Sequence, residues 1–204
     1  MNILTTEGML DLNHIPMHAM TAEVLGNTLA KINRFAGRTP EPWSVAAHSV
    51  LVARLCEGHR VSAWGAFHDA HEAFIGDIIT PAVSFIASQS QPMGAQIVQN
   101  CVRQAKQAID LQVRKAWNIC WDDELQAHVD QADKLALQAE MLWFFGTRPA
   151  EGISAELAHA HDIMREINPA NTWQTMARLW REEAERLVFL AGTPITQHIN
   201  PNAA

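Results

Sequence analysis

Apolar residues recur every three to four positions along most of the chain, a spacing typical of amphipathic helices. Capping residues mark several of the predicted helix ends: Thr21 and Ser44 precede apolar runs, and Gly37 and Gly58 follow them. The sequence shows no internal repeat and no alternation of strands and helices. It therefore predicts an all-α fold of about seven or eight helices. The expected helices cover residues 21–35, 45–57, 62–75, 80–88, 95–117, 122–145, 154–167 and 172–190.

The ends of the chain lack this helical period. Residues 1–20 include Gly8 and Pro16, and two short apolar stretches at 3–4 and 9–12 predict either a hairpin or an extended arm. The stretch SQSQPMG at 88–94 predicts an exposed loop. The chain is expected to form a single domain over 1–204. Its expected parts are an N-terminal arm (1–20), a core (20–145), C-terminal helices (146–192) and a loose tail (193–204).

Composition narrows the class of protein. The chain has 204 residues, of which 48% are hydrophobic and 18% charged, enough apolar material for a sizeable core. Its net charge of −7 argues against binding to a nucleic-acid polymer, which requires a basic surface. The three cysteines include no CxxC pair, and neither a secretory leader nor a long apolar run is visible. We therefore expect a cytoplasmic protein with no membrane partner.

The most unusual stretch is WGAFHDAHEAFIGDIITP at residues 64–81. It places His68, Asp69, His71, Glu72 and Asp77 within a run that is otherwise apolar. Acidic side chains are rarely buried unless they are paired or bind a metal. The stretch is therefore predicted to be a buried helix with a polar stripe suited to metal binding.

Two further polar residues interrupt apolar helical runs, His48 in WSVAAHSVLVARL and Asp133 in HVDQADKLALQAEMLWF. Together with His68 and Asp69 they would supply two nitrogen and two oxygen ligands. Such a set suits Co, Mn, Zn, Fe or Mg, with positions left open for water. A single histidine on an apolar face is more often an ordinary core residue, and an HD dipeptide alone is common. The hypothesis therefore depends on all four residues occurring together.

These motifs resemble the HD-domain metal-dependent phosphohydrolases. The segment HDAHEAFIGDIITP (68–81) is similar to that of the bacterial 5'-deoxynucleotidase branch and of related prophage proteins. INRFAGRTPEPWSVAAHSVLVA (32–53) and VDQADKLALQAE (129–140) resemble the segments that carry the first and last metal ligands in that branch. The resemblance covers roughly residues 20–145. It implies one divalent metal ion held by the four residues His48, His68, Asp69 and Asp133.

The resemblance also implies roles for neighbouring residues. Glu72 corresponds to the family's catalytic acid and Asp77 to a second catalytic acidic position. Arg34 corresponds to the arginine that binds the phosphate, and Phe35 stands where this branch has tryptophan. Thr80 and Pro81 would shape the sugar pocket, where a missing 2'-hydroxyl could be sensed.

Three residues keep alternative interpretations. His71 replaces a small or hydroxyl residue of the family; it could face away from the metal, contact a phosphate or supply a proton, or simply lie on the helix surface. Lys134 could bind phosphate or be a solvated surface residue. Trp43 could stack on a base or belong to the core.

The predicted function is therefore hydrolysis of 2'-deoxynucleotides, first of all release of phosphate from deoxynucleoside 5'-monophosphates. The alternative is hydrolysis of a deoxynucleoside triphosphate, as in related phage dATP triphosphohydrolases. That alternative would favour extra cations at the site, such as Arg38, Lys134 or Arg103. Other rivals are hydrolysis of a cyclic nucleotide or a (p)ppGpp-type substrate, and a non-catalytic HD protein that only binds nucleotides. The expected partners are a nucleotide substrate and further copies of the chain, in a homodimer or larger homo-oligomer.

Overall fold

The structure, a computed structural model, describes residues 1–6, 8–90, 92–167 and 172–192. The predicted loose tail at 193–204 lies outside the described residues. Two short strands are followed by helices throughout, and the predicted all-α class is confirmed. The elements are β1 (Asn2–Thr5), β2 (Gly8–Asp11), the 3-10 helix η1 (Met17–Met20), α1 (Ala22–Leu29), the 3-10 helix η2 (Phe35–Gly37), α2 (Val45–Leu55), α3 (His59–Phe67), α4 (Glu72–Ile75), α5 (Thr80–Ser88), α6 (Pro92–Trp117), α7 (Asp123–Phe145), α8 (Ala155–Ile167) and α9 (Trp173–Leu190).

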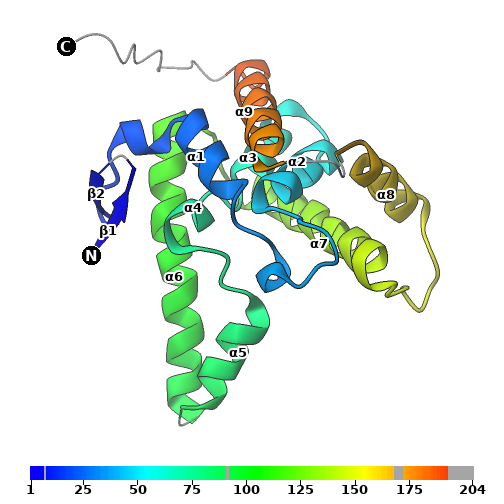
Figure 1. The fold of residues 1–204 in the computed structure, drawn as a ribbon, viewed down its shortest axis with the longest axis horizontal. Coiled ribbons are helices and arrows are strands. Elements are labelled where there is room, and N and C mark those ends of the chain that lie inside the picture. The colour runs from blue at the N-terminus through cyan, green and yellow to red at the C-terminus, as the bar shows by residue number, and fades with distance from the viewer. Residues whose placement is uncertain (7, 91, 168–171, 193–204) are drawn as a thin grey trace.

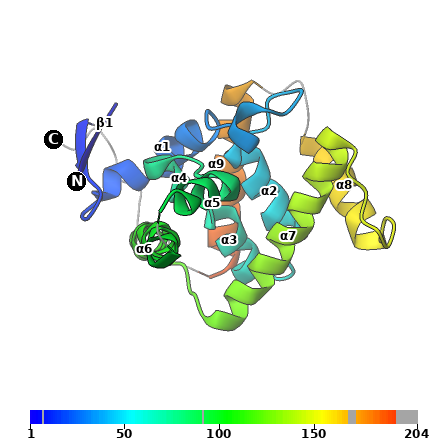
Figure 2. The same ribbon diagram turned by 90° about the horizontal axis from the view of Figure 1, so that it is seen from below.

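Helices α2, α3 and α9 form the centre of the molecule (Figures 1 and 2). The long helix α6 lies on one side of this centre and α7 with α8 on the other (Figures 1 and 2). Helix α9 packs against α1, α2 and α3, and α7 packs against α2, α3 and α8. Helix α5 packs against α6. No helix in the described part of the chain is both long and apolar enough to cross a lipid bilayer.

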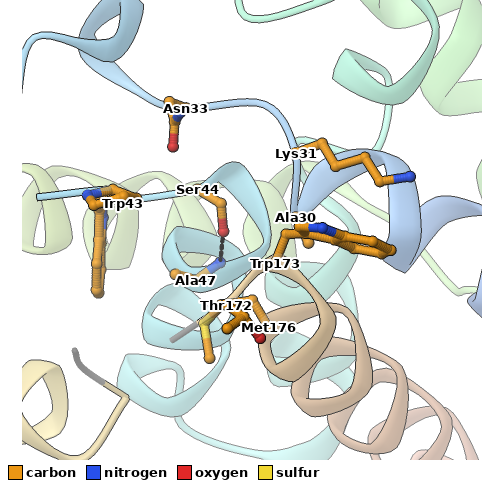
Figure 3. Close-up of a pocket in the computed structure, with 10 residues that line it drawn as sticks. Ala30, Lys31, Asn33, Trp43, Ser44, Ala47, Thr172, Trp173 and Met176 are labelled. Atoms are coloured by element: carbon orange, nitrogen blue, oxygen red, sulfur yellow. Dashed lines mark hydrogen bonds between the residues drawn. The ribbon is translucent and has the colours of Figure 1, made fainter. Parts of the chain in front are cut away.

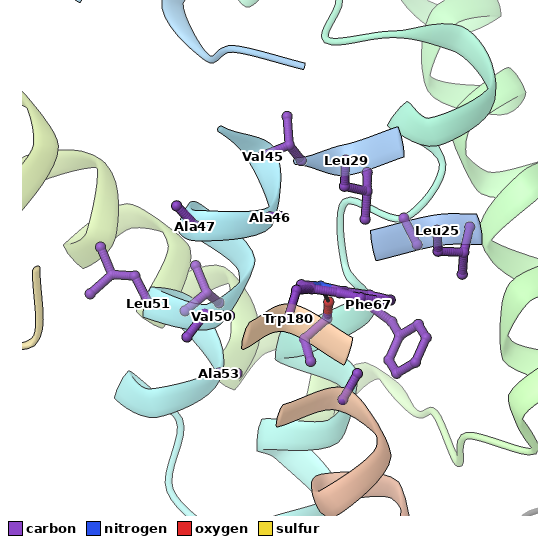
Figure 4. Close-up of a cluster of buried hydrophobic side chains, with 14 of the residues drawn as sticks. Leu25, Leu29, Val45, Ala46, Ala47, Val50, Leu51, Ala53, Phe67 and Trp180 are labelled. Carbon is purple, nitrogen blue, oxygen red and sulfur yellow. Dashed lines mark hydrogen bonds between the residues drawn. The ribbon is translucent and has the colours of Figure 1, made fainter. Parts of the chain in front are cut away.

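The apolar core holds the end of α3 in place. Trp180 of α9 is fully buried, and its indole Nε1 donates a hydrogen bond to the carbonyl oxygen of Ala66 at 2.9 Å. The Phe67 ring lies between the rings of Trp180 and Trp117, with centroids at 5.2 and 4.8 Å. Apolar side chains of α1 and α2 complete this cluster (Figure 4). The residues that follow Phe67 are therefore anchored by the buried core.

The single central helix predicted over 62–75 is wrong. Helix α3 ends at Phe67, residues 68–71 form turns, and α4 begins at Glu72. In this stretch the Ala70 amide donates to the Phe67 carbonyl and the Glu72 amide to the Asp69 carbonyl, so the spacing is i to i−3 rather than i to i−4. The tighter winding aligns residues three apart in the chain, His68 with His71 and Asp69 with Glu72, and leaves consecutive side chains about 120° apart. His68 and Asp69 still converge at their tips, because His68 Nε2 lies 3.3 Å from Asp69 Oδ2.

The helix predicted over 21–35 is also too long, because α1 ends at Leu29. Asn33 and Ser44 instead form an isolated antiparallel bridge, and the Arg34 amide donates to the Trp43 carbonyl at 2.9 Å. Phe35 then adopts the left-handed region, with φ of 55°. This extended segment, rather than a helix, carries the Arg34 side chain toward the centre of the protein.

Local sequence signals predicted the other boundaries well. Strands β1 and β2 form a hairpin, one of the two predicted alternatives, with Ile3 paired to Leu10. Helix α7 begins after the cap Asp122, whose carboxylate accepts a hydrogen bond from the Leu125 amide. It ends at Gly146, which has a φ of 66° that suits glycine. Helix α6 begins at Pro92, three residues earlier than predicted, so the loop expected over 88–94 is shorter than predicted.

Candidate metal and phosphate site

Three separate elements bring together the predicted metal ligands. His48 lies in the middle of α2, His68 and Asp69 in the turns after α3, and Asp133 on α7. One ligand atom each from His48, His68 and Asp69 lies within 4.8 Å of the others. Asp133 Oδ1 lies 3.0 Å from His48 Nε2 and 3.9 Å from His68 Nε2. The four residues therefore share one small volume.

The spacing of these atoms fits a shared metal ion. Asp69 Oδ2 lies 3.3 Å from His68 Nε2 and 3.6 Å from His48 Nε2. Ligands placed about 2.1 Å from one ion lie about 3.0 Å apart in an octahedron and about 3.4 Å apart in a tetrahedron. Nε2 of both imidazoles is buried and has no hydrogen-bond partner. Buried polar atoms are normally satisfied, so a cation between them would explain the arrangement.

The other ring nitrogen of each histidine is already held. His68 Nδ1 lies 2.8 Å from the Gly65 carbonyl oxygen, and His48 Nδ1 lies 2.7 Å from Glu140 Oε1. Because both partners are acceptors, Nδ1 carries a proton, and Nε2 presents its lone pair to the site once it is deprotonated. Metal-binding histidines are commonly oriented in this way by a carbonyl or carboxylate.

Glu140 is the functional residue that the sequence reasoning missed. It lies on α7 and is fully buried. Its Oε1 accepts a hydrogen bond from Trp43 Nε1 at 2.7 Å, and its Oε2 accepts one from Arg34 Nε at 3.1 Å. Burial by itself raises the pKa of Glu140, but the charges of His48 and Arg34 and these hydrogen bonds lower it below its usual value. The sequence does contain a signal for Glu140, because it is a carboxylate within an apolar run, two helical turns after Asp133 and therefore on the same face of the helix.

Arg34 links this buried network to the metal site. Its Nη1 lies 3.6 Å from Asp69 Oδ2, while its Nε is held by Glu140. The side chain is only 14% exposed. A guanidinium held on one edge keeps its remaining donors in a fixed direction, which suits binding of a phosphate. Trp43, in contrast, is buried in the core and its indole N–H is used by Glu140, so it does not offer a free face to a base.

Glu72 and Asp77 lie on the adjoining wall of the site. Glu72 is 3% exposed, its Oε2 has no hydrogen-bond partner, and Lys106 Nζ lies 3.8 Å from its Oε1. Burial, together with the nearby carboxylates of Asp69 and Asp77, raises the pKa of Glu72 to about 9. Burial likewise raises the pKa of Asp77.

A cavity of about 620 Å³ opens from the site, a volume in the range of small-ligand pockets. Arg34, Asp69, Glu72, Asp77 and Asp133 are among its lining residues. The remainder of the wall is largely apolar, and it includes most residues predicted to bind the sugar or base. The predicted residues in this wall are Phe35, Thr80 and Pro81, and Leu137, Met141 and Phe145 line it as well. Phe35 packs edge-on against Phe145, with ring centroids 5.3 Å apart.

A second cavity, of about 430 Å³, meets the first at Asp69 and Asp133. It is lined by the cations Arg103 and Lys106 of α6. Arg38 lines the first cavity instead. Lys134 is exposed and lines neither of these two cavities, so the structure does not bring it to the site.

A third hollow, of about 330 Å³, lies at the contact between α2 and the start of α9 (Figure 3). Lys31 lies over the Trp173 ring, 4.2 Å from its centroid, at one edge of this hollow. None of the predicted metal ligands lines it.

Metal binding at this site is expected to become tighter as pH rises. Burial lowers the pKa of His68, but the charges of Asp69 and Asp133 and the hydrogen bonds at the ring outweigh this effect and raise it to about 9. A metal ion must displace the proton, so its apparent affinity should rise on the order of tenfold per pH unit from about pH 6.5 to about pH 9 and then level. The same raised pKa stabilises the metal-free fold below about pH 6.5, and this contribution is lost as pH approaches 9.

Isothermal titration of the metal-free protein with Mn²⁺, in buffers of different ionisation enthalpy, measures both the affinity and the protons released. An affinity that does not change over this pH range, with no proton release, would contradict the assigned protonation of His68.

The chain was also compared with known proteins, and neither the models of protein families nor the curated protein sequences contain a match.

Proposed function

We propose that the protein is a divalent-metal-dependent phosphohydrolase of the HD-domain type that releases phosphate from 2'-deoxynucleoside 5'-monophosphates. The observation that carries the proposal is the convergence of His48, His68, Asp69 and Asp133 at ligand spacing, beside a buried arginine and a cavity of ligand size. The choice of a deoxyribose sugar rests on the resemblance of residues 68–81 to the deoxynucleotidase branch.

Each group of residues around the site would have a different role in such a reaction. A divalent ion at the four ligands would polarise a phosphoryl oxygen and lower the pKa of the attacking water. Arg34, held by Glu140, would orient the phosphate. The buried carboxyl group of Glu72 would transfer the proton between the attacking water and the leaving sugar oxygen. The apolar wall formed by Phe35, Met141 and neighbouring residues would hold the nucleoside and exclude bulk water.

A deoxynucleoside triphosphate is the second candidate substrate. The specific observation in its favour is the second cavity, which meets the first at Asp69 and Asp133 and is lined by Arg103 and Lys106. A polyphosphate could extend into this cavity while the nucleoside occupied the first. Both substrates would use the same metal ligands and the same Arg34.

Hydrolysis of a panel of dNMPs, NMPs and dNTPs tests the proposal, with products separated by chromatography. We expect nucleoside and phosphate from dNMPs in the presence of Mn²⁺ or Co²⁺, and no turnover in EDTA. Release of inorganic triphosphate from dNTPs would select the second candidate. If no nucleotide is turned over with any metal, the enzyme proposal is wrong and a protein that only binds nucleotides takes its place.

A further inference from the structure

His71 has the same arrangement as the two predicted metal-binding histidines. It is 4% exposed, and its Nδ1 lies 2.9 Å from Asp110 Oδ1 of α6. Its Nε2 is buried and has no hydrogen-bond partner, as is true of Nε2 in His48 and His68. In all three residues an acceptor therefore holds Nδ1 and leaves Nε2 free to bind a cation. This excludes the interpretation of His71 as a surface residue.

His71 lies beside two carboxylates. One ring nitrogen of His71 and one carboxylate oxygen from each of Asp69 and Glu72 lie within 4.8 Å of one another. Glu72, like His71, has a buried atom without a partner, its Oε2. We propose that Asp69, His71 and Glu72 form a second divalent-cation site next to the first, with Asp69 shared between the two.

The charges around the site favour a second cation. In the described part of the chain, the carboxylates around the site form ion-pair contacts with only two permanent cations, Arg34 and Lys106. The carboxylates of this network are Asp69, Glu72, Asp110, Asp133 and Glu140. With all five carboxylates ionised, Arg34, Lys106 and one divalent ion would still leave this network with net negative charge, and the phosphate of a substrate would add more. A second ion offsets both.

Lys106 does not fill this role. Its Nζ lies 3.8 Å from Glu72 Oε1, beyond hydrogen-bond distance, and it leaves Oε2 without a partner. A metal bound to Oε2 and Lys106 placed near Oε1 are compatible. Glu72 could then hold the ion with one oxygen and keep the other for proton transfer.

The ligand set suggests which ion binds and what it would do. One imidazole and two carboxylates suit Mn²⁺, Co²⁺ or Zn²⁺ better than Mg²⁺. Asp69 lines both cavities of the site, Glu72 lines the first and His71 the second. An ion between them would lie where the two cavities meet, next to the position expected for the phosphate. The site deepens the proposed function, because two cations about 3.5–4 Å apart can clamp both the attacking and the leaving oxygen in hydrolysis of a phosphoester.

Metal stoichiometry tests the second site independently of turnover. The full chain is freed of metal with EDTA, dialysed and titrated with Mn²⁺, and bound metal is measured by calorimetry and by elemental analysis. We expect two Mn²⁺ per chain for the wild type and one for His71→Ala. Low-temperature electron paramagnetic resonance should show a magnetically coupled pair in the wild type and an uncoupled ion in the variant.

Two further variants complete the test. Asp110→Asn should keep the first site and weaken the second about 10- to 100-fold, because it removes the charge that orients His71. His161→Ala is the matched control: it removes a histidine whose ring packs at a tilt against Trp143 and lines neither site cavity, and it should still bind two ions. Should His71→Ala fail to fold, Asp110→Asn decides the question.

The outcomes separate this inference from the proposed function. One Mn²⁺ per wild-type chain at saturation, or two in His71→Ala, would overturn the second site even if nucleotides are hydrolysed. Two ions bound without turnover of any nucleotide would leave the second site in place and overturn the enzyme proposal.

Discussion

Asp69→Asn is expected to abolish metal-dependent hydrolysis. Asp69 Oδ2 lies 3.3 Å from His68 Nε2, 3.6 Å from His48 Nε2 and 3.6 Å from Arg34 Nη1, so one carboxylate faces both candidate ligand imidazoles and the arginine proposed to bind phosphate. A neutral amide binds a cation weakly and no longer balances Arg34. We expect kcat/KM to fall roughly 10³-fold or more, about 4 kcal/mol of lost transition-state stabilisation.

The measurement is the rate of phosphate release with Mn²⁺ present, together with bound metal per chain. Asp162→Asn is the control, because Asp162 is an exposed carboxylate on α8 that pairs with Arg165 and lies outside both site cavities. Its rate should match that of the wild type. An Asp69→Asn protein that folds and retains activity within about tenfold of the wild type would remove Asp69 from the mechanism.

Glu140→Ala is expected to cause the largest loss of stability among single substitutions at the site. Its carboxylate accepts hydrogen bonds from Trp43, Arg34 and His48, and all of these contacts are largely closed to solvent. Removing it leaves a buried guanidinium and two buried N–H groups without their acceptor. Loss of one partner of a buried ionic network typically costs about 3–5 kcal/mol, so Tm should fall by about 10 °C in a chain of this size.

Thermal unfolding in EDTA, followed by circular dichroism, measures this effect without a contribution from bound metal. Glu182→Ala is the matched control, because Glu182 forms an exposed ion pair with Arg178 on α9, and its Tm should change by no more than about 2 °C. Glu140→Gln should be intermediate, since the amide keeps the shape but turns donor hydrogens toward Arg34. A Glu140→Ala protein as stable as the wild type would show that this network does not hold the fold together.

Glu140 also connects the candidate metal ligand His48 to Arg34. Its Oε1 orients the imidazole of His48, and its Oε2 holds Arg34. His48, a candidate metal ligand, and Arg34, proposed to bind phosphate, are thus both positioned by one buried carboxylate on α7. Under the proposed function, Glu140→Gln should weaken metal affinity about 10- to 100-fold as well as stability.

The sequence by itself determined the helical class and most element ends. These properties depend on short-range physics: apolar residues at helical spacing, the caps Ser44 and Asp122, and the left-handed Gly146. The sequence also identified His48, His68, Asp69 and Asp133 as candidate metal ligands, because each is a polar residue within an apolar run. A polar side chain in such a run needs a polar partner or a metal ion.

Only the tertiary structure decided how these residues meet. Glu140 accepts hydrogen bonds from Trp43 and Arg34, which lie 97 and 106 residues away in the chain, so no local pattern could predict these hydrogen bonds. His71 is buried because Asp110 of α6 packs against it, 39 residues further on. The break between α3 and α4 follows directly on Phe67, which packs against Trp117 and Trp180, both distant from it in the chain. A helical period of apolar residues predicts which side chains face inward. It does not predict which residue a buried polar side chain will contact, because that partner comes from a distant helix and depends on how the helices pack.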